Sequence, residues 1–175
     1  MLPFTALKNW AICSILATSS LVAAAQDRVS ILTIASFEKS NFFQTYRPQA
    51  SKPYALATGD TNFGYTTPDP DQSGTERVSV ALFGSQNFVT KASVVLIGRN
   101  INLPAQLTDA RAKYLAEFAK AVEPSANTGE LLKYVRANQG FNYPGGSEKM
   151  PRQQIGALSV YAGKNGSALI VGIEK

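Results

Sequence analysis

Cysteine and histidine are almost absent from this sequence. Cys13 is the single cysteine in 175 residues, and the chain contains no histidine. No intrachain disulfide can therefore form, and a folded domain has to be stabilised by the burial of apolar side chains. The same absence removes an imidazole base, a Cys-His nucleophile pair and the common His/Cys zinc sites. Any chemistry that remains has to use carboxylates, hydroxyls, amides and basic side chains.

The first 25 residues have the pattern of a secretory signal. Lys8 gives a positive start, residues 10–25 are apolar with many small side chains, and Ala23 and Ala25 form an A-x-A cleavage site. We expect residues 1–25 to be removed and 26–175 to fold as one domain in the periplasm or outside the cell. That domain carries 16 basic and 12 acidic side chains, a net charge of +4. No other apolar run approaches the roughly 20 residues of a membrane span, so no span is expected.

Hydrophobic periodicity predicts about five strands and two helices in this domain. The strands are an N-terminal strand over 29–34 and two hairpins over 78–98 and 157–173, the second with an Asn-Gly turn. The helices begin at the N-cap residues Thr108 and Asn127. The fold class is therefore α+β, a mainly antiparallel sheet with both helices on one face.

Residues 36–76 show no sustained helical or strand period and contain four prolines. We expect an ordered but irregular segment packed over the sheet, with a short helical turn around Asn41–Tyr46. A second long connection runs from Gly140 to Gln154. Long connections on a rigid scaffold often carry binding residues, so both are candidates for function.

An acidic run inside the first connection has the spacing of a calcium loop. Oxygen-bearing side chains occupy alternate positions and a glycine follows at position 6, as calcium loops require. The closing position, where a bidentate glutamate belongs, is Val80, and a shorter D-x-N-x-G pattern lies at 60–64. Turn chemistry accounts for the same residues, so we expect exposed turns and no cofactor, with Ca²⁺ as the alternative. The candidate metal ligands are Asp69, Asp71, Ser73, Thr75 and Glu76.

Aromatic side chains beside amides and glycines form the second candidate site. An exposed ring offers apolar contact while neighbouring amides fix orientation, which suits sugars or peptides. Phe42 and Phe43 are expected in the core instead. The candidate binding residues are Tyr46, Tyr54, Tyr65, Phe141 and Tyr143.

These observations favour an exported, non-enzymatic binding or accessory domain. Its long loops would recognise an envelope or extracellular protein, a glycan or an anionic surface. The basic residues are scattered along the chain, which disfavours nucleic acid as a partner. The alternative is a carboxylate-based hydrolase acting on glycans, although sequence spacing identifies no catalytic pair. Its candidate acids are Glu38, Asp60, Asp69, Asp71, Glu76 and Glu148.

Overall fold

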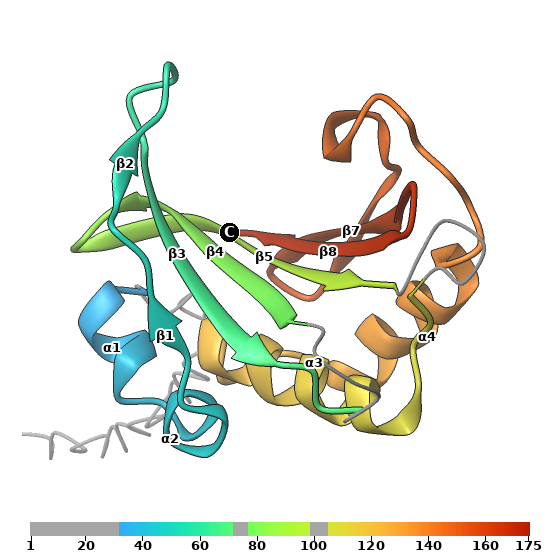
Figure 1. Cartoon of the computed structure of the whole chain (residues 1–175), viewed down its shortest axis with the longest axis horizontal. Helices are drawn as coiled ribbons and strands as arrows, with labels where there is room; N and C mark the ends of the chain where they lie inside the picture. The colour runs from blue at the N-terminus through green and yellow to red at the C-terminus, as the bar shows by residue number, and fades with distance from the viewer. Residues whose placement is uncertain (1–31, 72–76, 99–104) are drawn as a thin grey trace, which may run out of the picture.

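A computed structural model describes residues 32–71, 77–98 and 105–175 (Figure 1). The expected signal segment lies outside the described residues. In chain order the elements are α1 (Ile34–Glu38), α2 (Asn41–Tyr46), β1 (Gln49–Ala50), β2 (Tyr54–Ala55), β3 (Thr61–Pro68), β4 (Arg77–Ser85), β5 (Phe88–Ile97), α3 (Asp109–Val122), α4 (Thr128–Asn138), the 3-10 helix η1 (Ser147–Lys149), β6 (Arg152–Ile155), β7 (Leu158–Asn165) and β8 (Ala168–Glu174).

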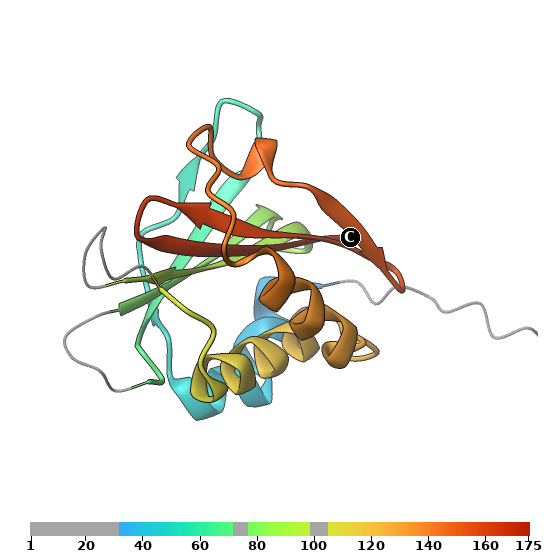
Figure 2. The ribbon, with the colours of Figure 1, turned by 90° about the vertical axis from the view of Figure 1, so that its right-hand side faces the viewer.

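The strands of the described residues form one antiparallel sheet of eight strands. Its order is β1-β3-β4-β5-β8-β7-β6, and β2 also pairs with β3. Helices α1 to α4 gather against one face of this sheet (Figures 1 and 2). The predicted α+β class, with its antiparallel sheet, is confirmed, although the sheet has more strands than the five expected.

The core lies between the sheet and the α-helices. Alternate residues of the longer strands β3, β4, β5, β7 and β8 point into it, as the period of two requires. Helix α3 covers these strands with Tyr114, Phe118 and Val122, which are at most 1% exposed. The central strands contribute Val78, Val80, Leu82, Ala92, Val94, Leu96, Leu169, Val171 and Ile173, each at most 1% exposed.

Both predicted helices begin at the expected caps. The Thr108 side chain accepts a hydrogen bond from the Arg111 amide, and the Asn127 side chain accepts one from the Glu130 amide. Each bond satisfies a backbone donor that the first helical turn would leave unpaired. The caps therefore fix where α3 and α4 begin.

The prediction of a strand over 29–34 is wrong at its described end. Residues 29–31 lie outside the described residues, and Ile34 begins α1. Thr33 and Ser36 form a reciprocal capping box, each side-chain oxygen accepting from the other's backbone amide at 3.0 Å. This local bonding outweighs the strand-like alternation that precedes it.

The prediction of irregular structure over 36–76 is wrong for β3. The helical turn at Asn41–Tyr46 is confirmed as α2, but Thr61–Pro68 forms a full strand paired with β4. In β3, Phe63 and Tyr65 face the core with 7% and 3% exposure. Glycine, asparagine and proline in the same segment mask this alternation because they are uncommon inside strands.

The C-terminal region also departs from the prediction. The expected loop 140–154 ends in an additional strand, β6, which pairs with β7. The last hairpin turns at Gly166-Ser167 and not at Asn165-Gly166, because Asn165 pairs with Ala168. Gly166 has φ 61° at the first loop position, a conformation that glycine adopts without strain.

A buried ion pair at each end of α3 ties this helix to the rest of the fold. The Asp69 carboxylate after β3 accepts hydrogen bonds from Nε and Nη2 of Arg111 on α3. Lys175 Nζ lies 3.0 Å from Glu123 Oε2 at the end of α3. Burial by itself would raise the pKa of Glu123, but hydrogen bonds from Lys175 and Ser125 outweigh it and lower the pKa below 4.5.

Candidate functional site

Asp69, the first residue of the acidic run that predicts a calcium loop, is buried in the fold. Asp69 is 4% exposed, with both carboxylate oxygens turned to Arg111, while Oδ1 also accepts from the Asp71 amide at 3.0 Å. Ser73, Thr75 and Glu76 lie outside the described residues, so the calcium loop stays a prediction. Within the described ranges, no group of three or more acidic, cysteine or histidine side chains is placed to hold a metal.

Two of the predicted aromatic residues belong to the core side of the sheet. Tyr65 is 3% exposed, and its hydroxyl donates to Glu38 at 3.0 Å. Burial, followed by this bond to Glu38, raises the pKa of Tyr65. Tyr46 packs edge-on against Tyr114 with ring centroids 4.6 Å apart. Tyr46 and Asp69 both line a surface pocket of about 340 Å³ beside α3. Phe42, expected in the core, is 1% exposed.

The other three predicted aromatic residues lie on two arms that rise beyond the helix-free side of the sheet. The β2 arm, residues 51–61, carries Tyr54 at 57% exposure, and the η1 arm, residues 140–151, carries Phe141 at 59%. Tyr143 of the η1 arm covers Gly163, where an added Cβ would lie 2.5 Å from the ring. Figure 1 shows the arms at opposite ends of this side, and Figure 2 shows both rising away from the helices. The structure therefore separates Tyr54 from Phe141 and Tyr143.

Between the arms lies the helix-free face of the sheet, which we call the open face. Its residues alternate with the core residues along β3, β4, β5, β7 and β8. The register places small residues in one row across four central strands, from Gly64 through Ala81 and Ser93 to Gly172. The next position of this row is Tyr161 on β7, followed by Arg152 on β6.

Five adjacent strands each contribute one side chain to a cluster on the open face. Tyr161 lies flat over Gly172, where an added Cβ would meet the ring at 1.9 Å. Lys91 Nζ lies 5.2 Å from the centre of this ring, and the Arg152 guanidinium carbon lies 5.1 Å from it. Glu174 joins the two cations, and Phe83 is a second ring for Lys91 at 5.6 Å. We call Phe83, Lys91, Arg152, Tyr161 and Glu174 the Tyr161 cluster.

The charges of the Tyr161 cluster are held in fixed positions. Arg152 donates to both oxygens of Glu174, at 3.1 and 3.2 Å, and Lys91 Nζ lies 3.6 Å from Oε1. The hydrogen bond from Arg152 is the largest cause that lowers the pKa of Glu174, and the same bond raises the pKa of Arg152. Two cations share one carboxylate, so the cluster carries one net positive charge.

Polar side chains also lie at the β2 end of the open face. Asn62 of β3 is 9% exposed and donates from Nδ2 to the Tyr54 hydroxyl at 2.8 Å. Asn62 pairs across the sheet with Phe83, so this group continues into the Tyr161 cluster.

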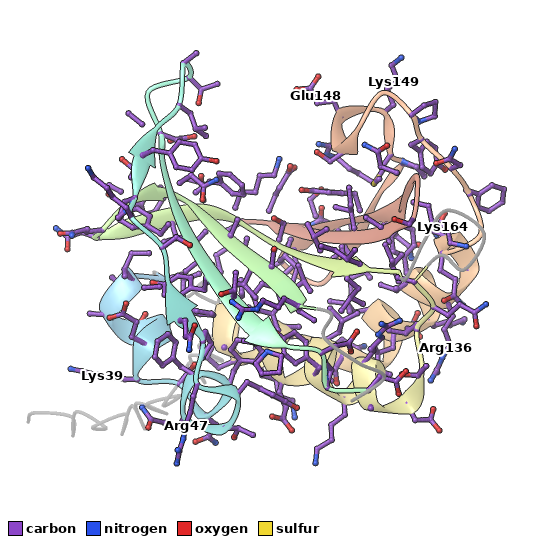
Figure 3. All side chains as sticks on the ribbon, in the orientation of Figure 1. Lys39, Arg47, Arg136, Glu148, Lys149 and Lys164 are labelled. Atoms are coloured by element: carbon purple, nitrogen blue, oxygen red, sulfur yellow. The ribbon has the colours of Figure 1, made fainter. Side chains whose placement is uncertain are left out.

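Charged side chains elsewhere are dispersed over the surface. Figure 3 shows Lys39 and Arg47 at the α1–α2 end, and Arg136 and Lys164 at the opposite end. Glu148 and Lys149 lie together at the tip of the η1 arm. These labelled basic residues therefore do not form a single patch.

Among the acids considered for hydrolysis, two have structural partners. Glu38 accepts from Tyr65, and Asp69 is paired with Arg111. Glu76 lies outside the described residues. Glu38 and Asp69 therefore stabilise the packing of β3 against the helices. We take the open face as the candidate site.

Sequence reasoning missed the Tyr161 cluster and Asn62. The five cluster residues come from five strands between positions 83 and 174, and only the cross-strand register brings them together. Asn62 was visible as part of the D-x-N-x-G pattern, but its place on a strand beside Tyr54 was not. The alternation of Phe63 and Tyr65 was the one local signal that would have identified β3 and its open side.

A scan against protein-family models, a search of curated proteins and a search of solved structures each give no match to this chain. Within the part of the chain that the structure describes, no helix combines the length and the apolar character needed to cross a membrane.

Proposed function

We propose that this protein is an exported, non-enzymatic binding domain that recognises its partner on the open face, between the β2 arm and the η1 arm. The observation that carries this proposal is the Tyr161 cluster. It places two cations and a carboxylate, all partly exposed, over the buried Tyr161 ring, on a sheet face that the α-helices leave uncovered (Figure 1). The other face packs against the α-helices, whereas the charged side chains of the Tyr161 cluster are about one third exposed and can contact a partner.

The cluster has the properties of a preorganised binding surface. Each charge is held by another cluster member, so little side-chain entropy is lost when a ligand docks. Aromatic and arginine side chains are also the types that concentrate binding energy in protein interfaces. The chain lacks histidine, and its only cysteine precedes the domain, which further favours binding over catalysis.

The shape of the face favours an extended partner. The row from Gly64 to Ser93 runs across three strands with small side chains, and the Tyr161 ring covers the next position, Gly172. One arm rises on either side of the open face (Figure 1). A segment of an envelope or extracellular protein, or a glycan chain, can lie along such a row. Export itself is supported by the signal-like residues 1–25.

Affinity capture from a native envelope extract tests the proposal. The bait is the purified protein, compared with Ala81→Glu, which adds a charged side chain in the middle of the open face. Ala116→Glu is the matched control, because Ala116 is a partly exposed residue of α3 on the opposite side. Thermal melts of all three proteins establish that each one is folded.

We expect the wild-type protein and Ala116→Glu to retain the same partner, and Ala81→Glu to lose it. Equal capture by both variants would place the binding surface elsewhere. The absence of a reproducible protein or polymer partner with the wild-type bait would contradict the binding function itself.

A further inference from the structure

The open face has a different kind of side chain on each side of its row of small residues. Gly64, Ala81 and Ser93 form this row on three adjacent strands, and we call them the small-residue row. Successive open-face residues of one strand are two positions apart, so each strand adds one neighbour on either side of the row. On β5 these neighbours are Lys91 and Val95, which flank Ser93. The row therefore has a charged edge and an aliphatic edge.

The charged edge belongs to the Tyr161 cluster and is positive. The side chains of Lys91 and Arg152 are 30% and 37% exposed, and Glu174, the acid that they share, is 28% exposed. Among the described residues, Glu174 is the only acid within ion-pair distance of either cation. One positive charge is thus left without a balancing acid in the cluster. An approaching carboxylate finds cationic hydrogen-bond donors that are already held in place.

The aliphatic edge lies on the other side of the small-residue row and is also partly exposed. Val95 of β5 pairs with Ile170 of β8, and both side chains are half-buried. Ile97, the next open-face residue of β5, is 40% exposed. Beyond Ile170, the register continues to Gly163 of β7, over which the Tyr143 ring lies. Covering these aliphatic side chains with apolar groups of a partner would be favourable, because it removes apolar surface from water.

An extended polypeptide fits between two such edges. Its side chains alternate between opposite sides of the backbone, so a segment that follows the small-residue row sends every second side chain to the same edge. One set of side chains then reaches Lys91 and Arg152, and the other set reaches Val95 and Ile170. The small side chains beneath allow the backbone of the segment to approach the sheet. The two edges therefore favour a segment that alternates acidic and apolar residues.

Neither a neutral glycan nor a second copy of this chain matches both edges. A neutral glycan has no group that balances the positive charge, and the opposite edge offers aliphatic side chains in place of the flat rings that suit sugars. A second copy would bring another net positive Tyr161 cluster to this face, and like charges across an interface repel each other.

We propose that the partner is an extended protein segment in which an acidic residue is directly preceded and followed by apolar residues. The segment lies along the small-residue row. Its acidic side chain contacts Lys91 and Arg152, and its apolar side chains cover Val95 and Ile170. This inference rests on the proposed binding function of the open face, and it names the chemistry of the partner.

The first experiment selects ligands from a display library of short random peptides, with the purified protein as the target. We expect the enriched peptides to share an acidic residue with valine, isoleucine or leucine on both sides of it. Ala81→Glu places a negative charge in the small-residue row and should not enrich these peptides. Ala116→Glu, on α3, is the matched control and should enrich them. One enriched peptide, synthesised with a fluorescent label, is the probe for titrations followed by anisotropy.

Variants of the two edges change the Kd of this probe in opposite directions. Lys91→Met removes a cation and should raise Kd at least about threefold, whereas Glu174→Gln removes the competing carboxylate and should lower Kd at least about threefold. Damage to the fold would weaken binding, so tighter binding by Glu174→Gln cannot be a structural effect. The double variant Val95→Thr with Ile170→Thr makes the aliphatic edge polar and should raise Kd at least about threefold. Lys113→Met removes an exposed lysine of α3 and should change Kd by less than about twofold.

Three results would overturn the inference. The first is that no peptide is enriched on the wild-type protein relative to Ala81→Glu. The second is that the enriched peptides lack an acidic residue. The third is that Glu174→Gln does not tighten binding, or that the double variant of Val95 and Ile170 leaves Kd unchanged. If partner capture from the envelope extract still depends on Ala81 in any of these cases, the proposed function stands and only the class of partner is wrong.

Discussion

Replacing Arg111 by methionine removes one half of the buried ion pair between α3 and the end of β3. The side chains of Arg111 and Asp69 are 6% and 1% exposed. Arg111 Nε donates to Asp69 Oδ1 at 3.2 Å, and Nη1 donates to the Gln106 carbonyl at 3.0 Å. Methionine fills a similar volume but provides no charge or donor, so the Asp69 carboxylate is left buried without its cation.

The expected loss of unfolding free energy is about 3–5 kcal/mol, the usual cost of leaving one charge of a buried pair uncompensated. With a denaturant slope of about 2 kcal/mol per M of urea, the unfolding midpoint falls by about 1.5–2.5 M. Lys113→Met is the matched control on the same helix. Lys113 is exposed and lies 4.0 Å from Glu117, and its loss should change stability by less than about 0.5 kcal/mol.

Urea titration followed by circular dichroism measures both variants. A loss below about 1 kcal/mol for Arg111→Met would refute the argument that this pair is desolvated and essential. The double variant Asp69→Asn with Arg111→Met should lose less stability than the two single variants added together, because it leaves no buried charge unpaired.

Three further outcomes follow from other contacts. Gly84→Ala should destabilise the protein by at least about 2 kcal/mol, since Gly84 has φ 137° and a Cβ there would lie 2.3 Å from a backbone oxygen, whereas Gly140→Ala, with open space, should be neutral or slightly stabilising in the same melts. Glu123 has a lowered pKa, so the folded state binds fewer protons than the unfolded state and stability is lost as pH falls below about 4.5; Glu123→Gln should flatten this acid limb in urea titrations from about pH 5 to pH 2. Millimolar Ca²⁺ should leave the melting temperature unchanged, because Arg111 uses both carboxylate oxygens of Asp69, and an upward shift would contradict this expectation.

The helices could be predicted from sequence because their signals are local. Thr108 and Asn127 bond to amides three residues ahead, and the apolar stripes repeat within one turn. The same kind of local bond misled the prediction at Thr33 and Ser36, where a capping box follows an alternating run. Cap bonds between residues three positions apart therefore predict where a helix begins, provided that the capping residues are recognised.

The sheet and its open face could be predicted only in part. Strands β4 and β5 are apolar enough to be predicted from their own sequences. Strand β3 is harder to predict because Gly64 interrupts it and Pro68 ends it. The Tyr161 cluster depends on a register across five strands, which no spacing in the sequence encodes. Exposed aromatic residues were found by composition, but their division between core and arms required the fold.

The pairing of β5 with β8 also governs when this protein can fold. Ala92 in β5 pairs with Ile173 in β8, which lies about 80 residues later in the chain. During synthesis, β3, β4 and β5 emerge first and expose one long side of β5, together with the apolar residues that α3 later covers. Contacts of such high sequence separation form slowly, since a long loop must close before they are made. A nascent chain of this protein therefore stays open to chaperones, and to pairing with other strands, until its final hairpin has been made.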